Sequence, residues 1–180
     1  MKIALCQINP TVGAINQNKK SIIDWYHRAV DLGADLVVFP ELSLIGYPPQ
    51  DLLLRNRFIE NAKNALDEIA QKSTIPIILG NTMMEDNKLY NCAFFCEKGE
   101  IISHYKKRLL PTYDVFDEAR YFTSGSEPCV VKLSINGENV YLGLQICEDL
   151  WDKNYSCDLV EEHKAYGFEK TNKFSDTPYR

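Results

Sequence analysis

The stretch ADLVVFPE, residues 34–41, is a short apolar run that ends at a proline. Such a run with β-branched members is typical of a buried strand. Before it, apolar residues recur at helical spacing over residues 16–32, and KIALCQIN (2–9) is another short apolar run. The order strand, helix, strand predicts two parallel strands joined by a right-handed crossover.

The rest of the chain continues this organisation. Alternating apolar residues on both sides of Asn136-Gly137 predict a hairpin, because Asn-Gly favours the tight turns that join antiparallel strands. Strands and helices in this order predict an α/β fold, in one domain, with helices layered on a mixed sheet. The other expected elements are a loop (42–54), a helix (56–72), a strand (75–81), a hairpin around residues 98–100 and a long loop (111–127).

Composition excludes several classes of protein. The 180 residues include 20 basic and 25 acidic ones, a formal net charge of −5, whereas nucleic-acid-binding domains carry a basic excess. We find no targeting segment and no run long enough to span a membrane, so we expect a cytoplasmic protein without a membrane partner. The six cysteines include no CxxC pair and the three histidines are scattered, so we expect reduced thiols and no metal site.

Three ionisable residues fall at the expected ends of strands, namely Glu41, Lys107 and Cys147. Each alone has an ordinary explanation: a solvated acid, a lysine that snorkels to solvent, or a core cysteine. Together they make a chemically coherent set, since a carboxylate can deprotonate a thiol and an ammonium can stabilise a thiolate or an oxyanion. No histidine is placed to act as the base of a thiol protease.

The chain resembles the nitrilase (carbon–nitrogen hydrolase) superfamily. The resemblance rests on three blocks, DLVVFPELSLIGYPPQDLL (35–53), YKKRLLPTYDVFDEARYF (105–122) and QICEDLW (145–151). It implies an α-β-β-α sandwich with a Glu-Lys-Cys triad. By the same matching, Glu41 is the general base, Lys107 the electrostatic stabiliser and Cys147 the nucleophile.

Within the superfamily, GYPPQDLL, LPTYDVFDEARYF and ICEDLW resemble the glutaminase domain of glutamine-dependent NAD synthetases. This resemblance implies that Tyr113 lines the glutamine pocket and that Glu118 is a second acid that holds the catalytic lysine. Glu148 and Asp149 follow the cysteine, where acids often cap the next helix or hold a loop. Glu148 is therefore expected to be a supporting residue.

The activity implied by the resemblance is hydrolysis of the glutamine amide through a thioester. The ammonia would serve ATP-dependent amidation of deamido-NAD to NAD in a synthetase domain, of which this chain carries no phosphate loop. The glutaminase step needs no cofactor, and ATP and deamido-NAD belong to the synthetase step. The full-length family implies a homo-oligomer. Two alternatives remain: an amidase or nitrilase acting on another small amide, or a non-catalytic module that binds a partner.

We expect the sandwich to be incomplete at its C-terminal end. Residues 1–167 form a partial carbon–nitrogen hydrolase domain, with NYSCDLVEEHKAYG (154–167) as a helix, and residues 168–180 form a divergent polar tail without a strand. Missing strands beside Cys147 would expose sheet edges and apolar faces. We therefore expect a truncated form that is poorly active or unstable alone.

Overall fold

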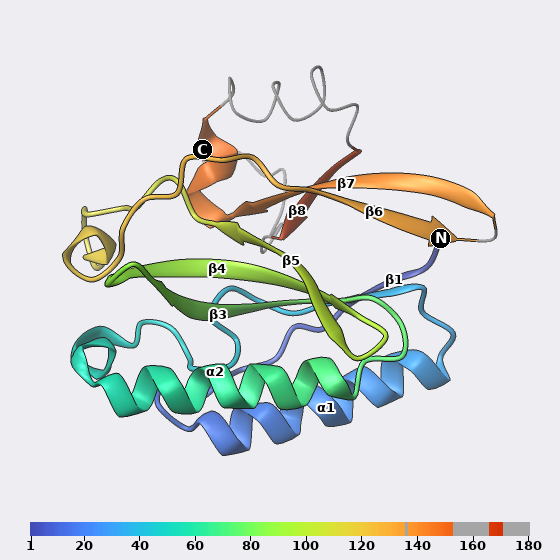
Figure 1. The fold of residues 1–180 in the computed structure, drawn as a ribbon, viewed down its shortest axis with the longest axis horizontal. Coiled ribbons are helices and arrows are strands. Elements are labelled where there is room, and N and C mark those ends of the chain that lie inside the picture. The colour runs from blue at the N-terminus through green and yellow to red at the C-terminus, as the bar shows by residue number, and fades with distance from the viewer. Residues whose placement is uncertain (136, 153–165, 171–180) are drawn as a thin grey trace, which may run out of the picture.

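The computed structural model describes residues 1–135 and 137–152 in full, and the backbone of residues 166–170. Three layers are stacked in it: two helices, a five-stranded sheet and a three-stranded sheet (Figure 1). The helices are α1 (Ile15–Asp31) and α2 (Asn56–Gln71). The first sheet has the order β1 (Ile3–Leu5), β2 (Leu36–Val38), β3 (Ile77–Glu85), β4 (Lys88–Glu97) and β5 (Glu100–Lys106). The second has the order β6 (Val130–Ile135), β7 (Glu138–Ile146) and β8 (Tyr166–Lys170).

The predicted parallel unit is confirmed. Strand β1 pairs parallel with β2, and β2 pairs parallel with β3, so α1 and α2 are the two crossover helices. Strands β3, β4 and β5 pair antiparallel. Strand β3 continues to Glu85, beyond the predicted end at residue 81, because it forms a hairpin with β4. Asp86 and Asn87 form its turn with φ of +50° and +59°, values that Asp and Asn tolerate better than most residues.

Successive side chains along β2 of the first sheet belong to two different apolar clusters. Val37 and Phe39 contact the apolar cluster that lies under α1 and α2. Leu36 and Val38 point to the opposite face and join the cluster shared with β6 and β7. Because successive side chains of a strand lie on opposite faces, a continuously apolar strand is what a sheet covered on both faces requires. The first sheet is therefore the central layer.

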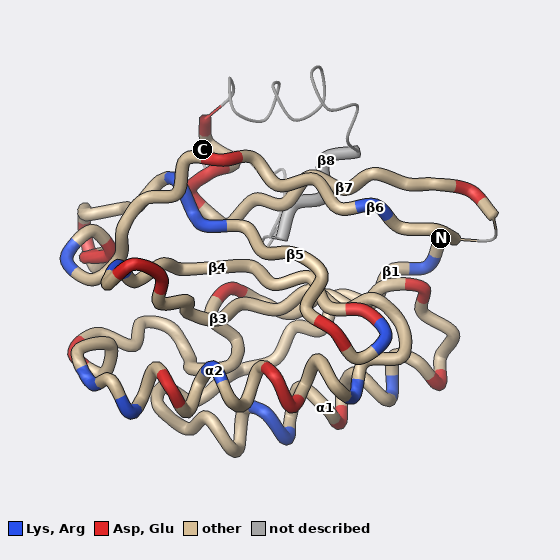
Figure 2. Tube along the Cα trace, in the orientation of Figure 1, with Lys and Arg blue, Asp and Glu red and all other residues tan. Residues whose placement is uncertain are grey.

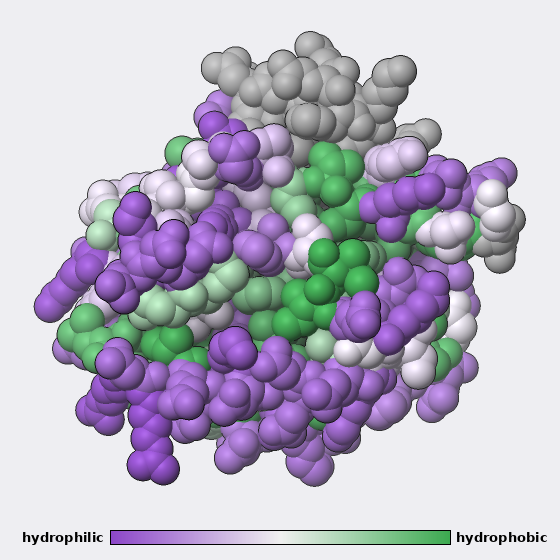
Figure 3. Space-filling model, in the orientation of Figure 1, coloured by the Kyte–Doolittle hydropathy of each residue, from purple (hydrophilic) through white to green (hydrophobic). Residues whose placement is uncertain are grey.

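Charged residues of both signs occur along α1 and α2 (Figure 2). The face of the molecule drawn in Figure 3 is largely hydrophilic, with an apolar strip between the helical layer and the second sheet. No helix in the described part of the chain is long and apolar enough to cross a membrane.

The second sheet corrects one prediction. We expected no strand after residue 167, but β8 pairs parallel with β7 from Leu142↔Tyr166 to Ile146↔Lys170. The β7 strand thus lies between two neighbours, and the open edge expected there is covered over these residues. The prediction was wrong because YGFEK contains no apolar run, whereas a strand at the edge of a sheet tolerates polar residues. The helix predicted for 154–167 falls mostly outside the described residues, as do residues 171–180 of the predicted tail.

Candidate active site

A buried lysine lies between two carboxylates at the end of the central sheet. The Nζ atom of Lys107 donates to Oε1 of Glu41 at 2.8 Å. Both carboxylate oxygens of Glu118 lie 2.8 Å from the same Nζ. The side chain of Lys107 is 0% exposed, against 16% for Glu41 and 5% for Glu118. The cluster of Glu41, Lys107 and Glu118 carries two negative charges and one positive charge when all three are ionised.

Glu41 is positioned by a close approach of two backbones. It follows β2, and β3 passes directly beside it at Gly80. A Cβ on Gly80 would lie 2.2 Å from the nitrogen of Leu42 and 2.9 Å from the Cα of Glu41. Only glycine permits this approach. From β4, the side-chain amide of Asn91 donates to Oε1 of Glu41 at 2.6 Å, so this oxygen is held by two donors.

Lys107 comes directly after β5 and is held by its backbone. Its N–H donates to the carbonyl of Asn91 at 2.8 Å, and its carbonyl accepts from the N–H of Gly125 at 2.8 Å. Its neighbour Lys106 faces elsewhere, in an ion pair with Glu85 and over the ring of Tyr90. Of the two adjacent lysines, Lys107 is therefore the one in the carboxylate cluster.

Tyr47, from the loop after β2, contacts Glu118, one of the two carboxylates that hold the lysine. Its hydroxyl donates to Oε1 of Glu118 at 2.8 Å. Burial, followed by the charge of Glu41, raises the pKa of Glu118. Burial acts to lower the pKa of Lys107, but the Glu41 and Glu118 carboxylates outweigh it, so that pKa is raised and the ammonium is retained.

Cys147 lies at the sharp turn from β7 into the 3-10 helix η3 (Cys147–Trp151). Its φ is +49°, in the left-handed region that non-glycine residues rarely adopt. Its thiol is partly exposed and takes part in no disulfide. Burial and the charge of Glu41 raise the pKa of Cys147 to about 11, while Lys107 acts to lower it. The thiol therefore lies within electrostatic reach of the cluster and is protonated at neutral pH.

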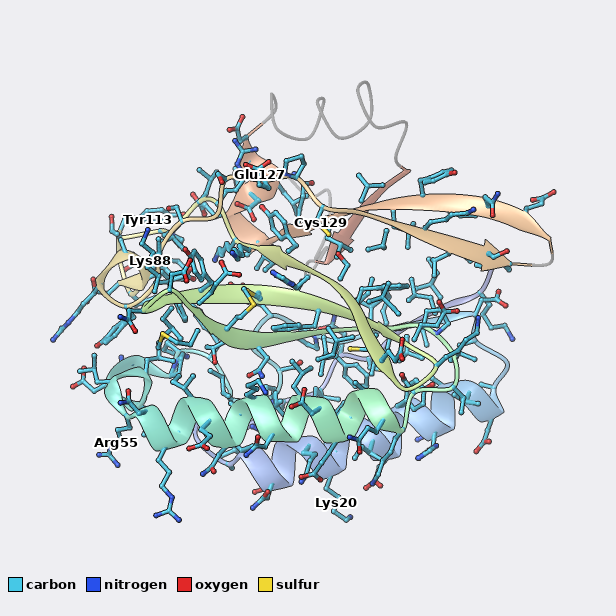
Figure 4. All side chains as sticks on the ribbon, viewed as in Figure 1. Lys20, Arg55, Lys88, Tyr113, Glu127 and Cys129 are labelled. Atoms are coloured by element: carbon cyan, nitrogen blue, oxygen red, sulfur yellow. The ribbon has the colours of Figure 1, made fainter. Side chains whose placement is uncertain are left out.

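Tyr113 and Glu148 form a second pair beside this thiol. The Tyr113 hydroxyl donates to Oε2 of Glu148 at 2.8 Å, and Tyr113 is 56% exposed. Tyr113 lies on the loop between β5 and β6 (Figure 4). The hydrogen bond to Glu148 raises the pKa of Tyr113, and the charges of Cys147 and Lys107 also act on it. Tyr113 and Glu148 thus lie together on the solvent side of the cluster.

Asp149 is fully buried and faces away from solvent, and its carboxylate accepts four hydrogen bonds from protein groups. Sequence reasoning missed the contacts of Asn91 and Tyr47. The only signal for Asn91 was a polar residue within the apolar run YNCAFF, and the signal for Tyr47 was its place in GYPPQDLL. Within the described residues, no group of three His, Cys, Asp or Glu is arranged to hold a metal ion.

Comparisons with known proteins agree on a family. A model described as carbon-nitrogen hydrolase matches residues 2–166. The glutamine-dependent NAD(+) synthetase of Thermotoga maritima is 41% identical over 155 residues, which are 84% of this chain and 26% of that protein. The solved structure of the glutamine-dependent NAD+ synthetase from Acinetobacter baumannii, in complex with ADP, matches with a TM-score of 0.83 and 34% identity, over 89% of this chain and 30% of that one.

A solved amidase from Nesterenkonia sp. AN1 matches with a TM-score of 0.73 and 27% identity, over 87% of this chain and 59% of that one. That structure is of a mutant amidase, in which the acetamide moiety of fluoroacetamide is covalently added at the active-site cysteine. This chain spans only about a quarter to a third of the synthetases, 26% and 30% in the two cases given. The match over residues 2–166, supported by both sequence and structural relatives, shows that the chain belongs to the carbon–nitrogen hydrolase family.

Proposed function

We propose that this domain hydrolyses the side-chain amide of glutamine through a thioester on Cys147. The observation that carries the proposal is the buried Lys107, held between Glu41 and Glu118 within electrostatic reach of the thiol. A nucleophile, a base and a fixed positive charge are the groups that acyl transfer from an amide requires. The synthetase relatives, named as glutamine-dependent, support glutamine as the amide.

Acylation begins with a protonated thiol, because the pKa of Cys147 is raised to about 11. Glu41 accepts the thiol proton as the sulfur attacks the amide carbon, so a free thiolate never accumulates. The negative charge that develops on the amide oxygen is stabilised by Lys107, together with the backbone N–H that follows Cys147. Glu41 then returns the proton to the leaving nitrogen, the carbon–nitrogen bond breaks, and ammonia departs from a thioester.

Deacylation repeats the same steps with water. Glu41 takes a proton from the water as its oxygen attacks the thioester carbon, and Lys107 again faces the oxyanion. The carbon–sulfur bond breaks, the sulfur regains its proton from Glu41, and glutamate is released. In this scheme Glu118 and Tyr47 hold Lys107 charged and in place, and Tyr113 with Glu148 lines the approach to the thiol.

We further propose that the ammonia serves the ATP-dependent amidation of deamido-NAD to NAD. The support is that the relatives it matches are named glutamine-dependent NAD synthetases, of which this chain spans 26% and 30%. Hydrolysis itself needs no cofactor in this scheme. A cytoplasmic homo-oligomer remains part of the proposal.

The test is ammonia release from glutamine by the purified chain and by Cys147→Ala. Loss of ammonia release is expected, because no other group in the proposal attacks the amide. Cys129→Ala is the matched control, since Cys129 is a buried thiol paired with Ser103 at 3.3 Å and should leave the activity unchanged. Ammonia release that persists in Cys147→Ala would contradict the proposal.

An amidase acting on another small amide is the second candidate, favoured by the likeness to the Nesterenkonia amidase. A panel of glutamine, asparagine, acetamide and propionamide separates the two. Preference for glutamine supports the glutaminase, whereas faster turnover of acetamide or propionamide supports the amidase.

A further inference from the structure

Asp149 is a buried carboxylate of η3, 0% exposed, whose two oxygens face two different segments. Its Oδ2 accepts from the N–H of Ile146 at 3.1 Å and from the hydroxyl of Tyr105 at 2.8 Å. Its Oδ1 accepts from the N–H of Arg108 at 3.1 Å and of Leu109 at 2.8 Å. Hydrogen bonds to a buried charged acceptor are among the stronger ones in proteins.

The donors are the immediate neighbours of the two reactive residues. Ile146 directly precedes Cys147, and Arg108 directly follows Lys107. The planar carboxylate therefore joins the backbone beside the thiol to the backbone beside the ammonium. We propose that Asp149 is a positioning residue that fixes the sulfur of Cys147 relative to Nζ of Lys107. This inference rests on the proposed function for its catalytic meaning, although the geometry stands without it.

A helix cap alone does not explain this arrangement. A cap satisfies the N–H groups of its own helix, as the bond from Ile146 does here. The other three donors come from β5 and the segment after it, 40 to 44 residues away in sequence. Strand β5 belongs to the first sheet and β7 to the second, so the carboxylate links the two sheets at the point where both reactive residues leave them.

Asp149→Asn is the informative substitution. The side-chain amide keeps the size of the carboxylate, but its nitrogen cannot accept a hydrogen bond, so the two donors on one side lose their acceptor. The segments of Cys147 and Lys107 are then no longer fixed together, and the ammonium stabilises the thiolate less. Loss of the Asp149 negative charge by itself would lower the pKa of Cys147, whereas loss of positioning raises it. The direction of the pKa change therefore distinguishes the two effects.

The measurement is the rate of alkylation of Cys147 by iodoacetamide at pH 9, followed on its peptide by mass spectrometry. Below the thiol pKa of about 11, this rate follows the thiolate fraction. We expect Asp149→Asn to slow it by about threefold to tenfold, equivalent to roughly half to one pKa unit. Asp51→Asn is the matched control, because Asp51 accepts from the Tyr121 hydroxyl at 2.6 Å on the exposed surface. A rate in Asp149→Asn that equals or exceeds the parent rate would overturn the proposal.

A double-mutant cycle with Lys107→Met separates positioning from a general structural effect. In the Lys107→Met background there is no ammonium for Asp149 to position near the thiol, so Asp149→Asn should not slow alkylation of Cys147 further. Equal slowing in both backgrounds would show that Asp149 acts only on the structure around the thiol. Tyr105→Phe removes one of the four donors without changing charge, and should slow alkylation at least twofold even if Asp149→Asn does not fold. An unchanged rate in Tyr105→Phe would count against the proposal.

Turnover supplies the second readout. In the parent chain, Asp149→Asn should lower kcat for glutamine and leave KM nearly unchanged, because reacting groups that are misplaced affect the chemical step. A parent chain that releases no ammonia from glutamine contradicts the proposed function, while the alkylation cycle still decides the role of Asp149. An increase in KM alone would place Asp149 in substrate binding and contradict the positioning role.

Discussion

Lys107 and Glu41 meet at a single oxygen: Nζ of Lys107 lies 2.8 Å from Oε1 of Glu41. Asn91 donates to the same oxygen at 2.6 Å. Both hydrogen bonds go to Oε1, and within the described residues none is seen at Oε2. In the mechanism that we propose, Oε2 is therefore the oxygen that takes the thiol proton, while Oε1 is held in place.

Glu41→Gln should separate thiol reactivity from catalysis. The Glu41 charge raises the pKa of Cys147, so its neutralisation lowers that pKa and increases the thiolate fraction at a given pH. Alkylation by iodoacetamide at pH 8 is expected to become faster than in the parent. Ammonia release should fall by about 10² to 10⁴-fold, the usual contribution of a general base.

The pH profile of alkylation checks whether Glu41→Gln lowers the pKa of Cys147. The midpoint for Glu41→Gln should lie below the parent value of about 11. A midpoint at or above that of the parent would show that the carboxylate does not act on the thiol, and would remove Glu41 as its base. Cys147→Ala supplies the background from the other thiols.

Asn91→Leu should lower kcat for glutamine by about tenfold to a hundredfold, since a hydrogen bond to a charged group contributes about 1.5–3 kcal/mol. Leucine has the same branching as asparagine and suits a buried position, whereas it cannot donate to Oε1 of Glu41. KM should change little, because Asn91 contacts Glu41 and Lys107 and is not placed beside Tyr113 and Glu148. Steady-state kinetics decides this, and a change confined to KM would refute it.

The central sheet shows why much of the fold is predictable. The helical spacing of apolar residues in 16–32 and the continuous apolar run at 34–41 predict which side chains are buried. A helix buries about every third or fourth residue, whereas a strand covered on both faces buries all of them. Helix α1 at Ile15–Asp31 and the parallel pairing of β1 with β2 confirm these predictions. Strand β8 escaped prediction because pairing with β7 orders its backbone, and backbone pairing leaves no apolar pattern in the sequence.

The site also contains residues that the sequence predicts and contacts that it does not. Glu41 and Lys107 follow β2 and β5, which run in the same direction in the first sheet, so the topology sends both toward one edge. Cys147 follows β7 of the second sheet, and its approach to them depends on how the two sheets stack. Asn91 reaches Glu41 only because of the register of β4 beside β3, and Tyr47 reaches Glu118 across 71 residues. The bridging role proposed for Asp149 depends on how the two sheets stack, which no local pattern encodes.

Lys107→Met tests the balance of charge in the buried cluster. Without the ammonium, Glu41 and Glu118 face each other uncompensated, and a broken buried pair costs about 3–5 kcal/mol at neutral pH. Burial and Glu41 already raise the pKa of Glu118, and loss of the cation raises it further. A carboxyl whose folded pKa is raised binds its proton more tightly when folded, so the loss of stability should shrink as pH falls.

Urea unfolding of the parent and of Lys107→Met at pH 7.5 and pH 5.5 measures this, and the stability difference should be smaller at the lower pH. Lys106→Met is the matched control, because Lys106 forms its ion pair with Glu85 near the surface. Its substitution should change stability by less than about 1 kcal/mol at either pH. A difference for Lys107→Met that grows toward acid would mean that Glu118 is not the group that takes up the proton.

Tyr113→Phe tests the approach to the thiol rather than the chemistry. The substitution removes the hydroxyl that donates to Glu148 at 2.8 Å and leaves the exposed ring. If Tyr113 and Glu148 contact the amino-acid part of glutamine, KM for glutamine should rise severalfold with kcat nearly constant, because uniform binding is lost. Acetamide lacks that part of the molecule, so its kinetics should not change. Tyr121→Phe is the matched control, since it removes a similar hydroxyl, bonded to Asp51 at 2.6 Å. Equal effects of Tyr113→Phe on glutamine and acetamide would move Tyr113 from substrate selection to the support of Cys147.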